Sequence, residues 1–157
     1  MPPKGGDWMN NYRINEFTLA IVPHGNNESI CYEIDDKIIV KKKTNFIISK
    51  NCINFGSSMS GRKDFTEHLT GYIYKAPILV HEEKKLIFFP TSSTRNKDCS
   101  WINLDNIDYT FYDEEKRTTK IVFINGLVLD FNISLNIINN QIYRATRLEH
   151  NLKKIYR

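Results

Sequence analysis

The sequence has no long hydrophobic run and no signal peptide. A helix that spans a membrane needs about 18 or more consecutive apolar residues, and no stretch of this chain approaches that length. Residues 1–11 are polar and lack the apolar centre of a secretory signal. We therefore expect a soluble protein of the cytoplasm that does not have the membrane as a partner.

Cysteine is scarce, and the sequence offers no metal site. Cys31, Cys52 and Cys99 are odd in number, widely spaced and without a CxxC pair, which argues for a reducing compartment and against a disulfide framework or a zinc knuckle. The four histidines lie in different predicted elements: His24, His68, His81 and His150. None has a partner at metal-ligand spacing, and no nucleophile stands beside a base. The sequence therefore predicts no metal, no cofactor and no enzyme.

The composition is that of one globular domain. Of the 157 residues, 41% are apolar and 25% are charged, and nine Phe and eight Tyr are ample for a core. Residues 1–8 look unlike the rest and are followed by Met9. We predict that residues 1–8 are a tag or a disordered arm and that residues 9–157 form a single domain.

The positive charge is modest and unevenly placed. The formal net charge of the whole chain is +4. Residues 141–157 hold five cations and one acidic residue, so this segment alone supplies +4 and the remainder is balanced. Any long-range attraction for a polyanion must therefore come from the C-terminal segment or from local clusters.

Short apolar runs separated by turn residues predict mainly β structure. The expected strands cover residues 17–22, 29–34, 37–40, 78–80, 86–89, 101–112, 120–124 and 127–131. Residues 46–49 read either as a further short strand or as the start of a turn. Asn125-Gly126, between the last two runs, is the strongest hairpin signal, because both residues tolerate φ > 0.

Two segments have helical features. Residues 57–69 offer Ser58 or Ser60 as a cap and a weak apolar face. From Ser134 onward the apolar period changes to near 3.6, with Ser134 or Asn136 as the cap. The apolar stripe consists of Ile138, Ile142, Ala145, Leu148, Leu152 and Ile155. We therefore expect an α+β, mainly β fold: an antiparallel barrel or sandwich of about seven short strands with a C-terminal amphipathic helix, in an element order like that of pleckstrin-homology domains.

Two polar stretches combine hydroxyl groups with cations. Residues 90–101 follow an apolar strand and contain Thr91, Ser92, Ser93, Thr94, Arg95, Lys97 and Ser100. Residues 55–63 contain Ser57, Ser58, Ser60, Arg62 and Lys63. Such groups donate hydrogen bonds to phosphates, and arginine is favoured in the narrow minor groove of A-tracts. Ser, Thr and Asn are also ordinary turn residues, so both stretches can equally be solvated turns.

These stretches resemble the competence transcription factor ComK family. The resemblance runs in order through residues 17–152 and is carried by Phe55-Gly56-Ser57-Ser58, Gly61-Arg62-Lys63, Pro77-Ile78-Leu79-Val80, Phe89-Pro90-Thr91, Ser92-Ser93-Thr94-Arg95, Cys99-Ser100-Trp101-Ile102, and Asn140-Gln141-Ile142-Tyr143-Arg144 with Ala145 and Leu148. It implies a bacterial transcriptional activator of DNA-uptake genes that binds paired A/T-rich boxes through the minor groove as a dimer or a pair of dimers. The transcription machinery is an implied partner. So is a proteolytic adaptor, although the tail with which family members can engage it is absent from this sequence, which stops at Arg157.

We assign the DNA contacts on physical grounds, in three groups. Arg62 and Arg95 are expected to enter or rim the minor groove. The residues expected to hold phosphates are Lys63, Lys97, Ser57, Ser58, Ser92, Ser93 and Thr94. The residues expected to steer or dock the DNA backbone are Arg144, Arg147, Lys153 and Lys154.

Two other functions remain open. A pleckstrin-type module could bind proteins or anionic lipids, with Lys41, Lys42 and Lys43 as a headgroup patch, although adjacent lysines also guard strand edges. A structural oligomerisation domain could use exposed edge strands as its contact. Liposome flotation measures lipid binding and a duplex gel shift measures DNA binding, so a comparison of the two assays distinguishes these functions.

Overall fold

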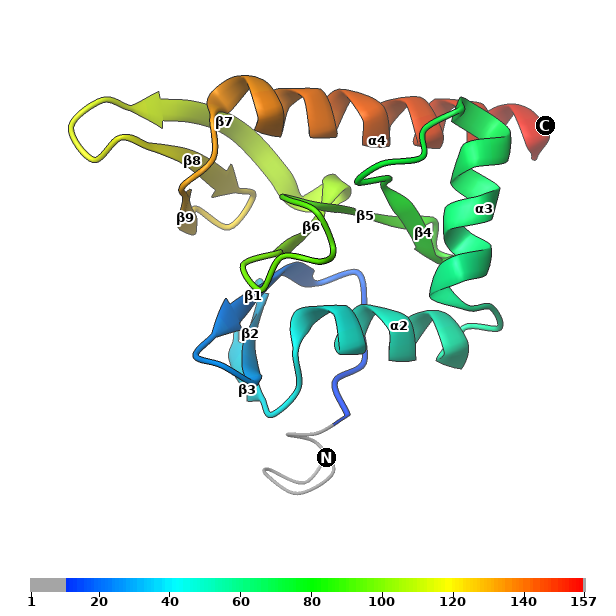
Figure 1. Cartoon of the computed structure of the whole chain (residues 1–157), viewed down its shortest axis with the longest axis horizontal. Coiled ribbons are helices and arrows are strands. Elements are labelled where there is room, and N and C mark those ends of the chain that lie inside the picture. Colours follow the sequence, from blue (N-terminus) through cyan, green and yellow to red (C-terminus); the bar gives the residue numbers. More distant parts are fainter. Residues whose placement is uncertain (1–10, 157) are drawn as a thin grey trace.

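The computed structural model describes residues 11–156, which contain nine strands and three α-helices (Figure 1). The strands are β1 (Thr18–His24), β2 (Glu28–Glu33), β3 (Lys37–Val40), β4 (Ile78–His81), β5 (Leu86–Pro90), β6 (Trp101–Asn103), β7 (Ile107–Asp113), β8 (Thr118–Phe123) and β9 (Val128–Phe131). The helices are α2 (Thr44–Asn54), α3 (Met59–Thr70), α4 (Leu135–Ile155) and the short 3-10 helix η1 (Leu104–Asn106). The arm or tag expected at residues 1–8 lies outside the described residues.

The strands form two antiparallel sheets. The larger has the order β3-β2-β1-β6-β5-β4, and the smaller has the order β7-β8-β9. The expected mainly β class with a C-terminal helix is confirmed, but the sheets do not close into a barrel, so the pleckstrin-like closure is wrong. The reason is that β6 pairs with both β1 and β5, which places it inside the larger sheet and leaves β7, β8 and β9 to pair among themselves.

The expected strand or turn at residues 46–49 is also wrong, because these residues belong to α2. The β-branched pair Ile47 and Ile48 favours a strand locally. The buried residues of α2 are Thr44, Ile47, Ile48, Asn51 and Cys52. Positions three or four apart lie on one face of a helix, so burial of that face against the sheet outweighs the weak local preference.

The larger sheet is buried on both faces. Phe88 belongs to one buried cluster with Trp101 and residues of α2, whereas its neighbours Ile87 and Phe89 belong to a second cluster with Leu148 of α4. This alternation follows from the two-residue period of a strand. Figure 1 shows α4 along one side of the sheet and α2 along the other. All five residues of β5 are buried as a result.

The long C-terminal helix α4 begins where the sequence predicts. Ser134 caps it by accepting a hydrogen bond from the Ile137 backbone N–H at 3.2 Å. Its fully buried residues are Ile138, Gln141, Ala145, Leu148 and Leu152. The predicted apolar stripe is confirmed except at its end, where Ile155 is exposed. Within residues 11–156 no helix is long and apolar enough to cross a membrane.

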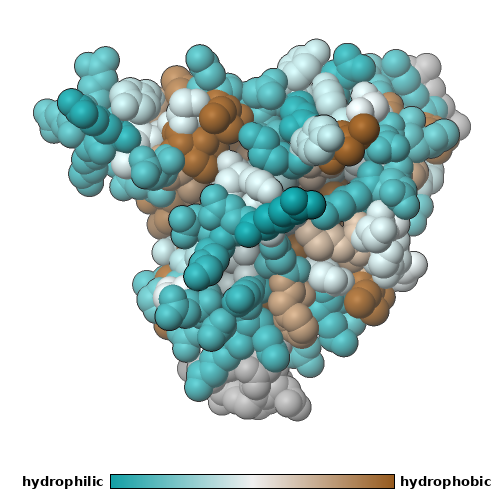
Figure 2. Space-filling model, viewed as in Figure 1, coloured by the Kyte–Doolittle hydropathy of each residue, from teal (hydrophilic) through white to brown (hydrophobic). Residues whose placement is uncertain are grey.

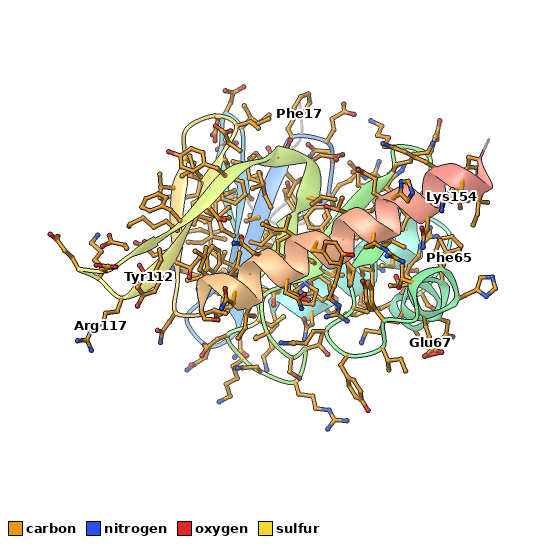
Figure 3. The ribbon with its side chains drawn as sticks, turned by 90° about the horizontal axis from the view of Figure 1, so that it is seen from above. Phe17, Phe65, Glu67, Tyr112, Arg117 and Lys154 are labelled. Atoms are coloured by element: carbon orange, nitrogen blue, oxygen red, sulfur yellow. The ribbon has the colours of Figure 1, made fainter. Side chains whose placement is uncertain are left out.

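The hairpin expected at Asn125-Gly126 is confirmed between β8 and β9, and Gly126 has a φ of 89°, which glycine adopts without strain. The β7–β8 turn, residues 114–117, lies at the end of an arm that projects from the molecule (Figure 1). Figure 3 places Arg117 of this turn and Lys154 of α4 at opposite ends of the protein.

Asn51 fastens the segment before β1 onto α2. This side chain is fully buried. Its Oδ1 accepts from the Ile14 backbone N–H at 2.8 Å, and its Nδ2 donates to the Tyr12 carbonyl at 2.9 Å and the Ile47 carbonyl at 2.8 Å. One amide therefore satisfies backbone groups of two segments that are distant in sequence.

All three cysteines are buried and unpaired. Burial raises the pKa of the Cys52 thiol to about 11. The pKa values of Cys31 and Cys99 are raised by burial as well. The thiolate is the nucleophilic form, so none of the three is arranged as a reactive thiol.

We expect Asn51→Leu to lower the free energy of unfolding by about 2–4 kcal/mol, because it leaves two buried backbone groups, Ile14 N–H and Tyr12 C=O, without partners. Urea denaturation followed by circular dichroism measures this change. Lys50→Ala, at an exposed position of the same helix, is the control and should shift stability by no more than about 0.5 kcal/mol. Equal midpoints for both variants would contradict the role of Asn51.

We expect an aromatic disulfide reagent at about pH 8 to react with none of the three thiols in the folded protein over minutes, and with all three after unfolding in guanidinium. Burial and the raised pKa values of Cys31, Cys52 and Cys99 cause this protection. Absorbance of the released thiolate counts the reacting groups. Rapid reaction of one thiol in the native protein would show that its site opens.

Candidate nucleic-acid interface

Residues 91–100, here the 91–100 connection, join β5 to β6, two neighbouring strands of the larger sheet. Its base is closed by Thr91 N, which donates to Ser100 O at 2.9 Å, and by Ser100 N, which donates to Thr91 Oγ1 at 3.1 Å. Near its tip, Ser93 Oγ accepts from Arg95 N at 3.3 Å. Arg95 and Lys97 are exposed, so an internally hydrogen-bonded loop presents both cations to the outside.

The N-terminal end of α2 is fastened against this connection. Thr44 Oγ1 donates to Cys99 O at 2.8 Å. Asn45 accepts from Trp101 Nε1 at 2.9 Å and donates to the Thr94 carbonyl. A hollow of about 280 Å³ lies between the connection, this helix end and the β1–β2 turn. Its charged lining residues are Lys43, Arg95, Lys97, Glu28 and Asp98.

Residues 71–77, here the 71–77 connection, join α3 to β4 and are tied to the first connection by α4. Gln141 is buried, and its Nε2 donates to Lys75 O at 2.9 Å and to Pro90 O at 2.7 Å. Pro90 directly precedes the 91–100 connection. One amide group therefore holds both connections in fixed relation to each other.

Arg144 reinforces this arrangement. Its Nη2 donates to Tyr74 O at 2.6 Å, and its Nη1 donates to Gln141 Oε1 at 2.7 Å and to Lys75 O at 3.4 Å. The guanidinium carbon lies 4.5 Å from the centre of the Tyr72 ring. Partial burial lowers the pKa of Arg144 from its ordinary value, yet a guanidinium stays protonated. Arg144, expected to dock DNA, is thus largely engaged in holding a loop.

The two connections line one surface. A second hollow of about 660 Å³ is bordered by Tyr74 and Lys75 from one connection, by Ser92 and Ser93 from the other, and by the N-terminal end of α4. Figure 2 shows hydrophilic residues across the centre of the face seen in Figure 1. Lys75 of one connection and Ser93 of the other, from separate parts of the chain, therefore border the same hollow.

Arg62 does not lie on that surface, contrary to expectation. It is 7% exposed, its Nε has no hydrogen-bond partner among the described residues, and its Nη1 lies 4.0 Å from Glu82 Oε2. The reason is its place on α3: Thr66, one turn later, is buried and donates to the Pro77 carbonyl at 2.7 Å. Arg62 shares this inward face and is not available to rim a groove.

The other candidates of residues 55–63 are partly engaged. Ser58 Oγ caps α3 by accepting from Gly61 N at 2.9 Å, and Ser57 lies beside it. Lys63 is half-buried. Burial raises the pKa of the Cys99 thiol, and the charge of nearby Lys63 acts in the opposite direction. Lys63 therefore acts on the 91–100 connection through its charge, whereas Arg62 faces Glu82.

The cations at the C-terminal end of α4 remain largely free. Arg147 and Lys154 are exposed and lie on the same stripe as Arg144. Lys153 is exposed and pairs with Glu149 at 3.9 Å, one helical turn away. An exposed ion pair of this kind contributes little to stability, so it does not keep Lys153 from a polyanion. Arg147, Lys153 and Lys154 can therefore all approach one.

Several residues of this surface escaped the sequence analysis: Lys43, Ile73, Tyr74, Lys75 and Gln141. A signal existed for Gln141, since it lies three residues after Ile138 and four before Ala145 on the apolar stripe. A polar residue on a buried face must find a partner. Lys43 was weighed only as part of a lysine run, and the 71–77 connection contains no motif.

Comparison with known proteins shows the family of this chain. The family model described as "ComK protein" matches residues 9–156. The chain is 31% identical over 157 aligned residues to the competence transcription factor of Bacillus subtilis (strain 168), covering 93% of this chain and 81% of that protein. No solved structure matches significantly. On the strength of a family match over almost its whole length, this chain belongs to the ComK family.

Proposed function

We propose that this protein is a transcriptional activator of competence genes that binds A/T-rich double-stranded DNA through the minor groove, as a dimer or higher oligomer. Its family and its likeness to a competence transcription factor support a competence transcription regulator. The observation that carries DNA binding is the fixed presentation of Arg95 and Lys97 from the 91–100 connection, beside Lys43. The protein would act at the nucleoid with the transcription machinery as its partner.

In this proposal Arg95 enters the minor groove. A narrow A/T-rich groove has an enhanced negative potential, which favours a guanidinium without base-specific hydrogen bonds. Lys97 and Lys43 lie on the same hollow and neutralise flanking phosphates. The N-terminal end of α2 borders this hollow and has no acidic residue in its first turn, so its backbone dipole favours an anion as well.

The remaining candidates have supporting roles. Ser93 and Thr94 lie on the same connection and offer hydroxyl groups to phosphates. Ser92, expected to do the same, has its Oγ buried and without a hydrogen-bond partner among the described residues, so this hydroxyl does not face a phosphate. Ser57, Ser58 and Lys63 follow the C-terminal end of α2, whereas the 91–100 connection borders its N-terminal end, so these three residues would contact a separate part of the DNA backbone. Arg147, Lys153 and Lys154 add long-range attraction along α4.

The lysine run fits an anionic-lipid patch poorly. Lys42 lies over the Phe46 ring, with its Nζ 4.8 Å from the ring centre. Lys43 lines the hollow that also contains Arg95 and Lys97. Lys42 and Lys43 thus contact different parts of the protein, and liposome flotation in the absence of DNA serves as the test for lipid binding.

We expect Arg95→Ala to reduce the preference for an A/T-box duplex over a G/C-rich duplex by roughly 5- to 150-fold, which corresponds to ~1–3 kcal/mol. Competition gel shifts at two salt concentrations, with a minor-groove drug as challenger, measure the preference. Arg117→Ala is the matched control, because Arg117 is an equally charged, exposed side chain on the projecting β7–β8 turn. Equal preferences of both variants and the wild type would contradict the role of Arg95.

We expect Lys97→Ala and Lys154→Ala each to reduce the slope of log affinity against log salt by about one, since each removes one phosphate contact. The A/T preference should stay unchanged, because phosphate contacts do not read sequence. Fluorescence anisotropy over a salt series gives the slopes. Lys116→Ala, on the β7–β8 turn, should keep the wild-type slope; an unchanged slope for Lys97→Ala would place DNA elsewhere.

A further inference from the structure

The 71–77 connection exposes two large apolar side chains at its tip. Tyr74 is 83% exposed and Ile73 is 60% exposed, the two highest values for large hydrophobic side chains among residues 11–156. Single exposed apolar residues are common on protein surfaces. Two adjacent ones on one short connection, each so fully exposed, form a projecting apolar tip.

This tip is rigidly supported. The carbonyl of Tyr74 accepts from Arg144 Nη2, and the carbonyl of Lys75 accepts from Gln141 Nε2 and Arg144 Nη1. Lys75 has a φ of 50°, a left-handed conformation that is unfavourable for a residue with a Cβ and persists only when its surroundings hold it. The protein therefore fixes in place a loop whose side chains it leaves in water.

The tip adjoins the surface to which we assign DNA. Tyr74 and Lys75 line the same hollow as Ser92 and Ser93 of the 91–100 connection. Gln141 Nε2 donates hydrogen bonds to Lys75 O, in the 71–77 connection, and to Pro90 O, which directly precedes the 91–100 connection. Arg147 is exposed on α4, one turn from Arg144. An apolar projection next to Lys75 and to the arginines of α4 is complementary to a stacked, polyanionic duplex.

We propose that the Ile73–Tyr74 tip is a wedge that enters a base-pair step of the bound duplex and kinks it. This inference rests on the DNA-binding function proposed above and names the part of the protein that deforms the DNA. Proteins of the minor groove commonly insert apolar side chains between base pairs, and the unstacked, bent duplex then contacts more protein surface. Pyrimidine–purine steps such as TA unstack most easily, so a wedge also favours A/T-rich sites that contain them.

The cations around the tip favour DNA over the other occupants of an apolar projection. A second copy of this chain would bring Lys75, Arg144 and Arg147 against the same cations. A duplex brings phosphates to them and a stack of bases to the tip. Lys75, exposed in part beside Ser93, is positioned for a phosphate that flanks the opened step.

The test uses a duplex with one central TA step in which 2-aminopurine, whose fluorescence rises on unstacking, replaces the adenine. On binding of the wild type we expect the fluorescence to rise and the end-to-end distance measured by energy transfer to shorten. Ile73→Ser combined with Tyr74→Ser should abolish the fluorescence rise and weaken binding by about tenfold, since the wedge is gone but the phosphate contacts remain. Both positions are highly exposed, so circular dichroism and the melting temperature should match the wild type.

Ile53→Ser is the matched control, because Ile53 is 55% exposed on α2, outside the 71–77 connection; it should behave as the wild type. A duplex kinked in advance by a single-base bulge at the step should restore the affinity of the double variant. A wild-type fluorescence rise in the double variant would overturn the wedge. The wedge would also be overturned if the double variant lost self-association or liposome binding but still unstacked the DNA as the wild type does. Failure of the wild type to prefer A/T-rich DNA would instead overturn the proposed function, so the two failures are distinguishable.

Arg144 is a positioning residue in this scheme. Arg144→Lys keeps the charge but loses the planar donor fork that holds the Tyr74 and Lys75 carbonyls. We expect a smaller 2-aminopurine rise with an unchanged salt slope, which a purely electrostatic role for Arg144 would not produce. An unchanged rise in Arg144→Lys would contradict positioning.

Discussion

The buried side-chain amide of Gln141 is the contact on which the polar surface depends. Its Nε2 donates to the carbonyls of Lys75 and Pro90, which belong to segments that the chain separates by the whole β4–β5 hairpin. A buried donor without a partner is costly, whereas a satisfied one fixes geometry. Because α4 supplies this amide, the packing of its apolar face against the sheet also sets the position of both connections.

Cations serve two distinct purposes in this fold. Arg144 and Arg62 point toward the protein, where Arg144 holds carbonyl groups and an aromatic ring and Arg62 faces Glu82 at long distance. Arg95, Lys97, Arg147 and Lys154 face water. Net charge alone therefore overstates the surface available to a polyanion. A guanidinium that is bonded within the protein adds to the positive electrostatic potential but offers no accessible hydrogen-bond donors.

Features with a local cause were accessible to sequence reasoning. The Asn125-Gly126 turn, the Ser134 cap and the helical stripe of α4 each depend on neighbouring residues, and all three are confirmed. Features that depend on distant partners were not. The pairing of β1 with β6 spans about half the chain, and α2 is a helix because Ile47 and Ile48 meet the sheet.

The candidate site divides in the same way. Its hydroxyl-rich, cationic loop was visible in the order of residues 90–101, because Pro90 ends a strand there. The Arg62 side chain points inward because it lies on the face of α3 that packs against β4. No residue type in residues 55–63 indicates which face of this helix is buried. The exposure of Tyr74 was equally hidden, since an aromatic residue in a sequence is first expected to be buried.

The position of Gln141 so late in the chain also orders events during synthesis. Both connections leave the ribosome well before α4, and the strand β6, which completes the middle of the larger sheet, precedes α4 as well. A nascent chain can thus pair its strands but lacks the amide that aligns its two loops until α4 docks. Maturation of the surface is coupled to the synthesis of α4, so a translation product interrupted before this helix would have the strands of both sheets but no aligned surface.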